Sequence, residues 1–422
     1  MTAGGWGASP PEQPYSGPPP TGRYGAPPQV PVGVPGPAWG PPWSPTPWGG
    51  PPWGVPPWGV PPWGVPPWGV PPWGVPPWGA PPPVPARGPG RAVTPPGAPP
   101  FDTPQPFALL MRARDWAWWR PLLGFLLFTV LYMVAALVLV FVVLATGVVP
   151  DLALLDLTDV AVLLVTNLSL IVAIPIVWVC WLVPHGLGIG WSSSVLGWLR
   201  WRLFLPVTWR ALATLGVAVA LGLLIAVVAT GVEVTGPGPS FGWMLLVVLT
   251  TTPLQAAAEE YVFRGYLSQA IAGWIGRPVV GAAVAGVVSA ALFSAAHAPP
   301  DFQTFLYRFA IGLALSAAVW LTGGLEASIA LHAVNNVVIF LLAGALGDRA
   351  AAAEPGGVLG WATSLLGILG MAAFVVWLAR SRPQLRPELL SPAVDLRPGA
   401  GPIGGRPAGP PGWVPGPPPA WG

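Results

Sequence analysis

The sequence contains very little charge, and every basic residue in it is an arginine. Of the 422 residues, 8% are Asp, Glu, Lys or Arg, and no lysine occurs. Average globular chains carry about 25% charged residues. With 53% hydrophobic residues, the composition indicates that a lipid bilayer is the main solvent of the folded part. The net charge of +3 is too small and too scattered to indicate a nucleic-acid partner.

Cysteine and histidine are also scarce. The single cysteine, Cys180, excludes a disulfide framework and a thiolate metal cluster. The first hundred residues contain no apolar run of the kind found in a cleavable signal peptide, so membrane insertion is expected to depend on internal segments. Of the three histidines, His297 and His332 fall in the later apolar runs, whereas His185, in VPHGLG, is expected to be a loop histidine.

Proline and glycine dominate both ends of the chain. Residues 51–80 consist of five PPWGV units and one PPWGA unit. Proline removes backbone donors and favours polyproline II, while glycine prevents persistent stiffness, so neither a helix nor a sheet is expected. We predict a disordered arm over 1–105 and a second disordered Pro/Gly-rich tail over 383–422. The tryptophans of the arm offer contacts to a membrane interface or to a protein partner.

Residues 106–382, between these tails, contain apolar runs long enough to cross a bilayer. Crossing about 30 Å of hydrocarbon takes around 20 helical residues. Eight runs are candidates: Leu122–Val148, Val160–Val183, Ala211–Thr230, Phe241–Ala258, Val279–Ala296, Phe305–Leu321, Leu325–Leu346 and Val358–Leu378. The sequence therefore predicts an all-α, polytopic membrane bundle of about eight transmembrane helices.

The distribution of arginine predicts the orientation of this bundle. Arginines precede the first run, lie between the second and third, and follow the last: Arg112, Arg114, Arg120, Arg200, Arg202, Arg210, Arg380, Arg382 and Arg386. Aspartates instead follow the first run: Asp151, Asp156 and Asp159. The positive-inside rule then places both termini in the cytoplasm, as an even number of spans requires. We expect a multi-pass protein of the cell membrane.

The stretch LQAAAEEYVFRGYLSQ, residues 254–269, places three charges directly after an apolar run. Glu260 and Arg264 are four residues apart, with the acid N-terminal to the base, which favours an ion pair within a helix. Glu259 points about 100° away from Glu260, so Arg264 is poorly placed to neutralise it. We interpret Glu259 as a candidate general base facing a cavity. A purely structural pair is the simpler alternative for Glu260 and Arg264.

Two further patterns place polar residues in later apolar runs. In LFSAAH a phenylalanine lies four residues before His297, and in LHAVNN His332 lies four residues before Asn336, with Asn335 turned away. Ionisable residues in membrane spans are rare and usually face a bundle interior or a water-filled cavity. Three such patterns therefore indicate one site. The alternatives are an interfacial histidine for His297 and interhelical hydrogen bonds for His332 and Asn336.

Together, EEYVFRG, FSAAH and HAVNN resemble the motifs EExxxR, FxxxH and HxxxN of the CPBP family. This family groups CAAX-processing type II prenyl endopeptidases with bacteriocin-processing and self-immunity proteins. The order and spacing of the motifs fit, and the resemblance covers roughly residues 240–350. It implies an intramembrane endopeptidase in which Glu260 and Arg264 brace the helix as structural support.

Carried over by position, the resemblance also implies four catalytic residues. Glu259 is expected to activate the attacking water with help from His297. His332 and Asn336 are expected to stabilise the oxyanion of the tetrahedral intermediate. The expected substrate is a membrane-associated protein or peptide, cleaved within the lipid bilayer.

A metal requirement stays open at this point. The resemblance covers proteins described as metalloproteases and also as metal-free, glutamate-dependent proteases. This chain has no HExxH motif, and Asn336 suits oxyanion donation better than zinc ligation. We favour a mechanism without a cofactor. The alternative is zinc held by Glu259, His297 and His332, since zinc accepts histidine and carboxylate ligands.

Two other classes of function compete with proteolysis. The buried Glu, Arg and His residues could line an ion or proton path in a transporter or channel, although no internal repeat typical of transporters is evident. Alternatively, the chain is a non-catalytic membrane scaffold or immunity protein that displays the tryptophan–proline arm to partners.

The depth of His332 is a difficulty for a single site. We count about 1.5 Å of helix rise per residue from the turns expected near Gly276 and Gly323. This count places Glu259 and His297 at the same depth in the membrane to within about 5 Å. If all spans have the same length, the same count places His332 at a depth about 15 Å from that of Glu259 and His297. Unequal helix lengths, tilt or a dip at APPDFQ must close this gap.

Overall fold

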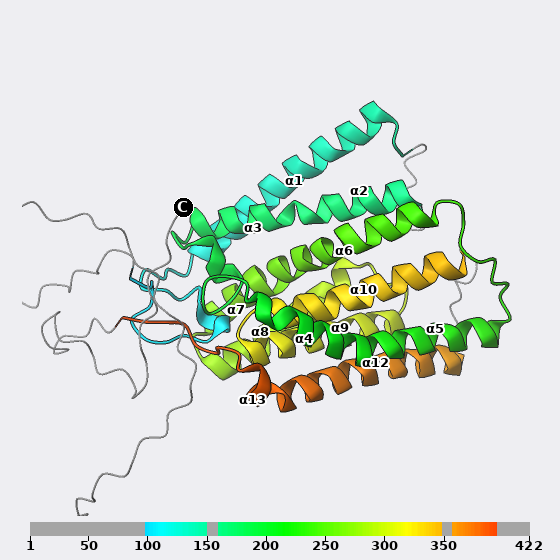
Figure 1. Cartoon of the computed structure of the whole chain (residues 1–422). Helices are drawn as coiled ribbons and strands as arrows, with labels where there is room; N and C mark the ends of the chain where they lie inside the picture. Colours follow the sequence, from blue (N-terminus) through cyan, green and yellow to red (C-terminus); the bar gives the residue numbers. More distant parts are fainter. Residues whose placement is uncertain (1–97, 150–158, 348–356, 395–422) are drawn as a thin grey trace, which may run out of the picture. The chain divides into compact units, whose positions relative to one another are not determined.

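The structure is a computed structural model, and it describes residues 98–149, 159–347 and 357–394 (Figure 1). Every described residue belongs to one compact unit. The predicted arm up to residue 97, with all its PPWGV units, lies outside the described residues, as do residues 395–422 of the predicted tail.

The described residues confirm the predicted all-α membrane bundle. They contain eight helices long and apolar enough to cross a membrane, and no strand. The spans are α1 (Arg120–Thr146), α2 (Val160–Ile171) continued by α3 (Ala173–Leu182), α4 (Trp201–Ala211) continued by the π-helical η4 (Leu212–Gly216) and α5 (Val217–Thr230), α6 (Phe241–Val262) continued by the π-helical η5 (Phe263–Leu267) and α7 (Ser268–Ile275), α8 (Pro278–Ala296), α9 (Phe302–Thr322), α10 (Glu326–Leu346) and α12 (Gly357–Arg380).

Two spans are longer than their apolar runs predict. The third begins at Trp201 in α4, an amphipathic helix in which Leu203 and Val207 are buried and Arg202 is exposed. Its arginines lower the local hydropathy, so a hydropathy criterion misses the first turns. The fourth span continues through EEYVFRG to Ile275, since the charged residues there are buried inside the bundle.

Local chemistry sets the reversals that bring the polar motifs together. Pro278 occupies the first turn of α8, where its missing N–H costs nothing. The side chain of Asp301 caps α9 by accepting from the backbone N–H of Thr304 at 2.7 Å. Gly276 and Gly323 end α7 and α9 at positive φ, the left-handed conformation that glycine adopts without strain. Two tight helical hairpins, α7–α8 and α9–α10, follow from these residues.

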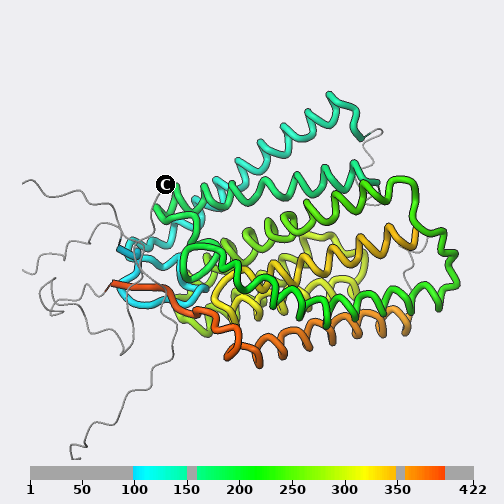
Figure 2. The backbone as a smooth tube through the Cα atoms, viewed as in Figure 1, coloured from blue at the N-terminus to red at the C-terminus, as the bar shows by residue number. Residues whose placement is uncertain are grey.

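In the bundle, α6 lies beside α2, α3 and α10, and α10 also contacts α4 and α9 (Figure 2). The helix α8 lies between α7 and α9, and α12 contacts α5 and α9. By contrast, only 6% of the most apolar stretch of α1 is buried in the protein, and side chains such as Leu137 and Phe141 are exposed. Such an exposed apolar surface suits a helix that faces lipid.

The segments that flank the spans fold back onto the bundle and meet each other. The short 3-10 helix η1 (Phe107–Leu109) follows an isolated antiparallel bridge between Pro106 and Leu390. The backbone N–H of Ser391 donates to the carbonyl of Gln105 at 2.8 Å, and Phe101 is buried. Residues 98–105 and 383–394, which the composition assigns to the tails, thus lie against the membrane domain.

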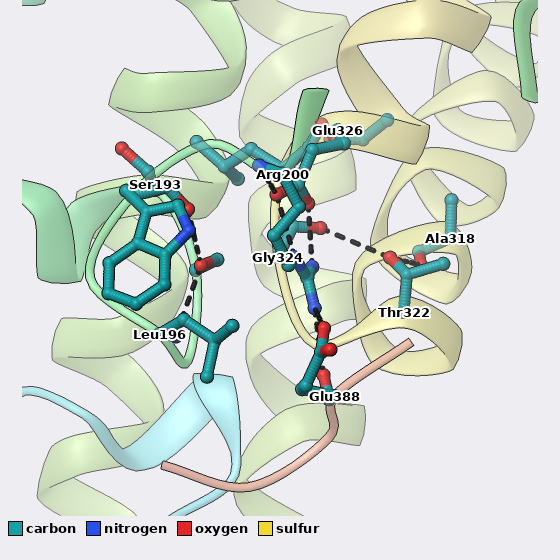
Figure 3. A network of polar contacts seen from close by, with 12 residues as sticks. Ser193, Leu196, Arg200, Ala318, Thr322, Gly324, Glu326 and Glu388 are labelled. Carbon is teal, nitrogen blue, oxygen red and sulfur yellow. Dashed lines mark hydrogen bonds and ion pairs between the residues drawn. The ribbon is translucent and has the colours of Figure 1, made fainter. Parts of the chain in front are cut away.

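A buried ion pair fastens this end of the bundle (Figure 3). Arg200, directly before α4, donates from Nε and Nη2 to the two carboxylate oxygens of Glu326, at 2.8 and 2.6 Å. Both side chains are almost fully buried, with 2% and 0% exposure. The third arginine nitrogen, Nη1, donates to the carbonyl of Glu388 at 2.9 Å. A Cβ on Gly324 would stand 2.4 Å from Nη2 of Arg200, so only glycine fits there.

Candidate active site

The two adjacent glutamates lie near the end of α6, between two irregularities of the helix. Pro253 stands inside α6, and the π-helical segment η5 begins three residues after Glu260. Proline removes one helical hydrogen bond, and π-helical turns are rare and frequent at functional sites. Glu260 is fully buried and Glu259 is 8% exposed. The acidic pair is therefore held on an interrupted helix inside the bundle.

The expected ion pair between Glu260 and Arg264 is present. Nη1 of Arg264 donates to Oε1 of Glu260 at 3.0 Å, and both side chains are buried. Arg264 also donates from Nη2 to the carbonyl of Gly312 in α9 at 3.0 Å. Its guanidinium carbon stands 4.8 Å from the ring centroid of Phe293 in α8. Arg264 thus ties α6 to α8 and α9, in line with a bracing role.

His332, on the second turn of α10, connects the two glutamates. Its Nδ1 lies 2.9 Å from Oε1 of Glu260, and its Nε2 lies 3.6 Å from Oε2 of Glu259. Glu260 already accepts from Arg264 and is therefore an acceptor, so Nδ1 of His332 is the donor in this contact. In the neutral imidazole, the unprotonated Nε2 then faces Glu259.

His297 approaches the same oxygen from α8. It caps the C-terminus of this helix, and its Nε2 lies 3.7 Å from Oε2 of Glu259. Its Nδ1 lies 2.7 Å from the carbonyl oxygen of Phe293. Because a carbonyl can only accept, Nδ1 must donate, and the neutral ring again turns an unprotonated Nε2 toward Glu259. The Phe293 ring contacts both imidazoles, with centroids 4.6 Å from His297 and 5.5 Å from His332.

Three acceptor atoms consequently face one another. Oε2 of Glu259 is buried and has no hydrogen-bond partner among the described residues. The Nε2 atoms of His297 and His332 lie at 3.7 and 3.6 Å from it. A buried acceptor without a donor is costly. A water molecule that donates one proton to the carboxylate and the other to one imidazole satisfies two of these three acceptors, and it is then oriented for deprotonation.

Gln255 completes the site and is missing from the predicted set. Its Nε2 donates to Oε1 of Glu259, and its Oε1 accepts from Nδ2 of Asn336 at 3.0 Å. Asn336 is thus linked to Glu259 through Gln255, and Asn335 donates to Oδ1 of Asn336 at 3.0 Å. The sequence carries a signal for Gln255, which precedes Glu259 by one helical turn.

The depth difficulty for His332 disappears in the structure, where it lies within hydrogen-bond distance of Glu260. The count by residues treated the helix that carries Glu259 as a straight rod. This helix is instead a 35-residue composite interrupted by Pro253 and by η5, whereas α8 and α9 have 19 and 21 residues. His185 lies outside the site, in the turn after α3, with its Nε2 3.2 Å from the hydroxyl of Tyr266.

The expected zinc alternative finds no metal-binding geometry. In the part of the chain that the structure describes, no group of three His, Cys, Asp or Glu side chains could hold a metal ion. Zinc requires ligand atoms within about 2.0 to 2.2 Å of the ion. Metal-bound histidines do donate their other ring N–H to a carbonyl or carboxylate, as His297 and His332 donate here. The orientation of these rings therefore fits both a metal ligand and a hydrogen-bonded water molecule.

The fold and the site define the class of protein: a multi-pass α-helical membrane protein with a Glu–His–His–Asn cluster, of which Glu259 and His332 are buried. Comparison with protein families shows that residues 240–338 match the Rce1-like family, described as type II CAAX prenyl endopeptidase Rce1-like. This match agrees with the family resemblance that the three motifs carry. The matched residues contain the helices from α6 to α9, the first part of α10 and every residue of the predicted site.

Two further comparisons bear on relatives. An uncharacterized protein of Bacillus subtilis (strain 168), YyaK, is 31% identical to this chain over 105 residues. The aligned part covers 24% of this chain and 34% of that relative, so the chain matches about a third of its length. No solved structure matches the chain.

Proposed function

We propose that this protein is an intramembrane endopeptidase that hydrolyses peptide bonds of membrane-associated proteins or peptides. The observation that carries the proposal is the unpartnered Oε2 of Glu259, which faces the Nε2 atoms of two histidines at 3.6 and 3.7 Å. The match to a family described by endopeptidase activity supports the same reaction. Buried Glu and His side chains also form proton relays in membrane transporters, so ion flux is measured below as the competing readout.

In the proposed mechanism, Glu259 removes a proton from a water molecule that His297 helps to orient. The resulting hydroxide attacks the carbonyl carbon of the scissile peptide bond, and the carbonyl oxygen becomes an oxyanion. The proton held by Glu259 then passes to the leaving amine, so that the acid is restored to its starting state. Gln255 keeps Oε1 of Glu259 occupied, and Oε2 is thereby left for the water.

The oxyanion is stabilised by His332 and Asn336 in this proposal. His332 enters the step as the doubly protonated ring, with Nδ1 donating to the Glu260 carboxylate and Nε2 donating to the oxyanion, and it keeps both protons throughout. Asn336 uses one amide hydrogen on Gln255 and has a second hydrogen for the substrate oxygen. The chemistry uses protein side chains and water, with no step through a metal.

We propose that the substrate enters from the end of the bundle where both terminal segments lie. His332 is six residues beyond the start of α10, or about 9 Å along the helix. That same end carries the Arg200–Glu326 pair and the bridge between Pro106 and Leu390. With both termini in the cytoplasm, as the arginine pattern predicts, the site faces the cytoplasmic half of the cell membrane.

Glu259→Gln tests the proposed function, because the amide keeps the shape of the side chain and cannot accept the proton. Loss of a general base is expected to lower cleavage by about 100-fold or more. Membrane proteins from cells with the wild-type chain and with the variant are compared by mass spectrometry for cleaved termini. Candidate substrates are then cleaved with purified protein in liposomes. Glu388→Gln, which removes an acid on the terminal segment, is the matched control.

Wild-type cleavage by Glu259→Gln would exclude the base role. Ion flux in the same liposomes separates the competing class: flux that requires Glu259, without cleavage of any membrane protein, would assign the chain to transport instead. A role of the tryptophan–proline arm in binding a partner stays a prediction, which deletion of residues 1–105 tests separately.

A further inference from the structure

A large cavity in the described part of the chain has a lining that does not include Glu259. Its volume is about 700 Å³, and it is walled by η1, η5, α7, α8, α9 and the residues Arg382, Leu389 and Leu390. Small and apolar side chains of α8 and α9 form most of its lining. This volume falls within the range of about 300 to 1,000 Å³ that small-molecule sites occupy.

Two fully buried polar residues line this cavity, and each has one atom without a partner among the described residues. Arg264 uses Nη1 and Nη2 on Glu260 and Gly312, but its Nε has no acceptor. Gln269 donates from Nε2 to the carbonyl of Gly265 at 3.3 Å, and its Oε1 has no donor. That carbonyl also fixes the amide orientation, since a carbonyl only accepts. An unused donor and an unused acceptor thus stand at one apolar cavity.

The π-helical segment explains why both residues reach the same place. Arg264 and Gln269 are five residues apart, with η5 covering the interval up to Leu267. A π-helical turn bonds residues five apart and places them on one face, whereas an α-helix would separate them by about 140°. The irregular turn therefore builds a polar site into the wall of this cavity.

We propose that this cavity binds a neutral lipid whose head carries a hydroxyl group. A hydroxyl oxygen accepts from Nε of Arg264, and its hydrogen is donated to Oε1 of Gln269, so a single group satisfies both atoms. Beside these two atoms an anionic head is a poor match, because Gln269 presents an acceptor and the charge of Arg264 is already paired with Glu260. Arg382 also lines the cavity, so an anionic competitor is included in the test. The apolar chain of the lipid contacts the alanine and valine side chains of α8.

The surroundings of the cavity favour entry from the bilayer. Val279, Val287 and Trp320 line the cavity and are also exposed, by 68%, 51% and 45%. They belong to α8 and α9, two of the membrane spans. A lipid can therefore move sideways into the cavity without leaving hydrocarbon. The occupant is expected to be a long-chain alcohol or a diacylglycerol, which share this head chemistry.

Photolabelling of the full chain in phosphatidylcholine vesicles tests the inference. The probe is a long-chain alcohol with a diazirine on its chain, and labelled peptides from α7, α8 and α9 are quantified by mass spectrometry. Unlabelled hexadecanol or dioleoylglycerol is expected to displace the probe. The stronger of the two competitors shows whether the occupant is a long-chain alcohol or a diacylglycerol. Hexadecane, without a head, and hexadecyl phosphate are expected to compete about tenfold more weakly, because the hydrogen bonds are lost.

Two variants make the result specific. Gln269→Leu removes the unused acceptor and is expected to weaken hexadecanol about tenfold while leaving hexadecane unchanged. Its melting temperature should be equal or higher, because a buried unpartnered atom disappears. Ala282→Trp fills the cavity and should abolish labelling, whereas Val284→Trp, on the same helix but outside the lining, should preserve it.

Failure to label these helices, equal competition by hexadecanol and hexadecane, or unchanged labelling in Gln269→Leu would each overturn the proposal. Binding is measured here without cleavage of any substrate. The result is therefore independent of whether Glu259 acts as a protease base.

Discussion

Replacing Glu326 by glutamine removes the carboxylate that neutralises Arg200 and leaves an oxygen in place for the hydrogen bonds. In the structure, this carboxylate accepts from the backbone N–H of Arg200 at 2.7 Å as well as from its Nε and Nη2. Both side chains are buried, so the loss of one charge leaves the other in a region of low dielectric constant. The variant therefore tests how strongly this end of the bundle depends on charge pairing.

The structure sets the expected magnitude. Breaking a buried ion pair from one side costs about 3 to 5 kcal/mol. Glu388 remains 3.3 Å from Nη1 of Arg200, but its side chain is 38% exposed and replaces the lost charge only in part. We therefore expect Glu326→Gln to lower the free energy of unfolding by about 3 kcal/mol, at the lower end of that range. Arg200→Met should cost a similar amount.

The assay is a double-mutant cycle measured by reversible unfolding in detergent micelles. Arg200→Met combined with Glu326→Gln leaves no unpaired buried charge, so the double variant should lose less than the sum of the single variants. Arg202→Gln is the matched control: it removes an exposed ion pair with Glu388 and should cost below about 1 kcal/mol. Additive losses in the cycle would refute the reasoning.

Three further predictions follow from the site and its surroundings. Gln255→Leu should lower kcat by about 100-fold with little change in KM or melting temperature, because Glu259 loses its orienting donor. Dialysis against EDTA should leave cleavage unchanged, and a loss that zinc restores would revive the metal alternative. Burial and the charge of Arg120 lower the pKa of His185 from 6.5 to about 4, so the folded state binds fewer protons than the unfolded chain between these values. Stability should therefore fall from pH 7 to pH 5 by about 2 kcal/mol, and His185→Gln should remove this loss.

Most of the fold could be predicted because a bilayer imposes a simple requirement on sequence. Each span needs a long apolar run, and the eight runs coincide with the eight helices of the described residues. The prediction was incomplete where polar side chains interrupt a run. Arg202 and Arg210 lower the hydropathy of the first turns of the third span, so the sequence did not predict these turns. The hydrogen-bond partners of these arginines lie near the end of the described chain, 171 or more residues away, and no local pattern indicates them.

The candidate site was accessible from the sequence because its members repeat a local spacing. Glu260 with Arg264, and His332 with Asn336, are each four residues apart on one helix. Gln255 has the same spacing from Glu259 and could have been recognised. The pairing of Arg200 with Glu326 could not, because 126 residues separate them and no local pattern relates the two. The cavity beside Arg264 also escapes the sequence, since it depends on a π-helical turn that no composition signals.

The contact between the two terminal segments also concerns the low-complexity sequences attached to them. Val394 donates from its backbone N–H to the carbonyl of Phe101 at 2.9 Å, so the first and last described segments of the chain are adjacent there. Tryptophan–proline sequence continues from both segments, as PPWGV units before and as GPPGWVPGPPPAWG after. A protein that recognises such sequence meets two tethered copies, and the second attachment becomes intramolecular. Binding to both copies together would then be tighter than binding to either copy alone.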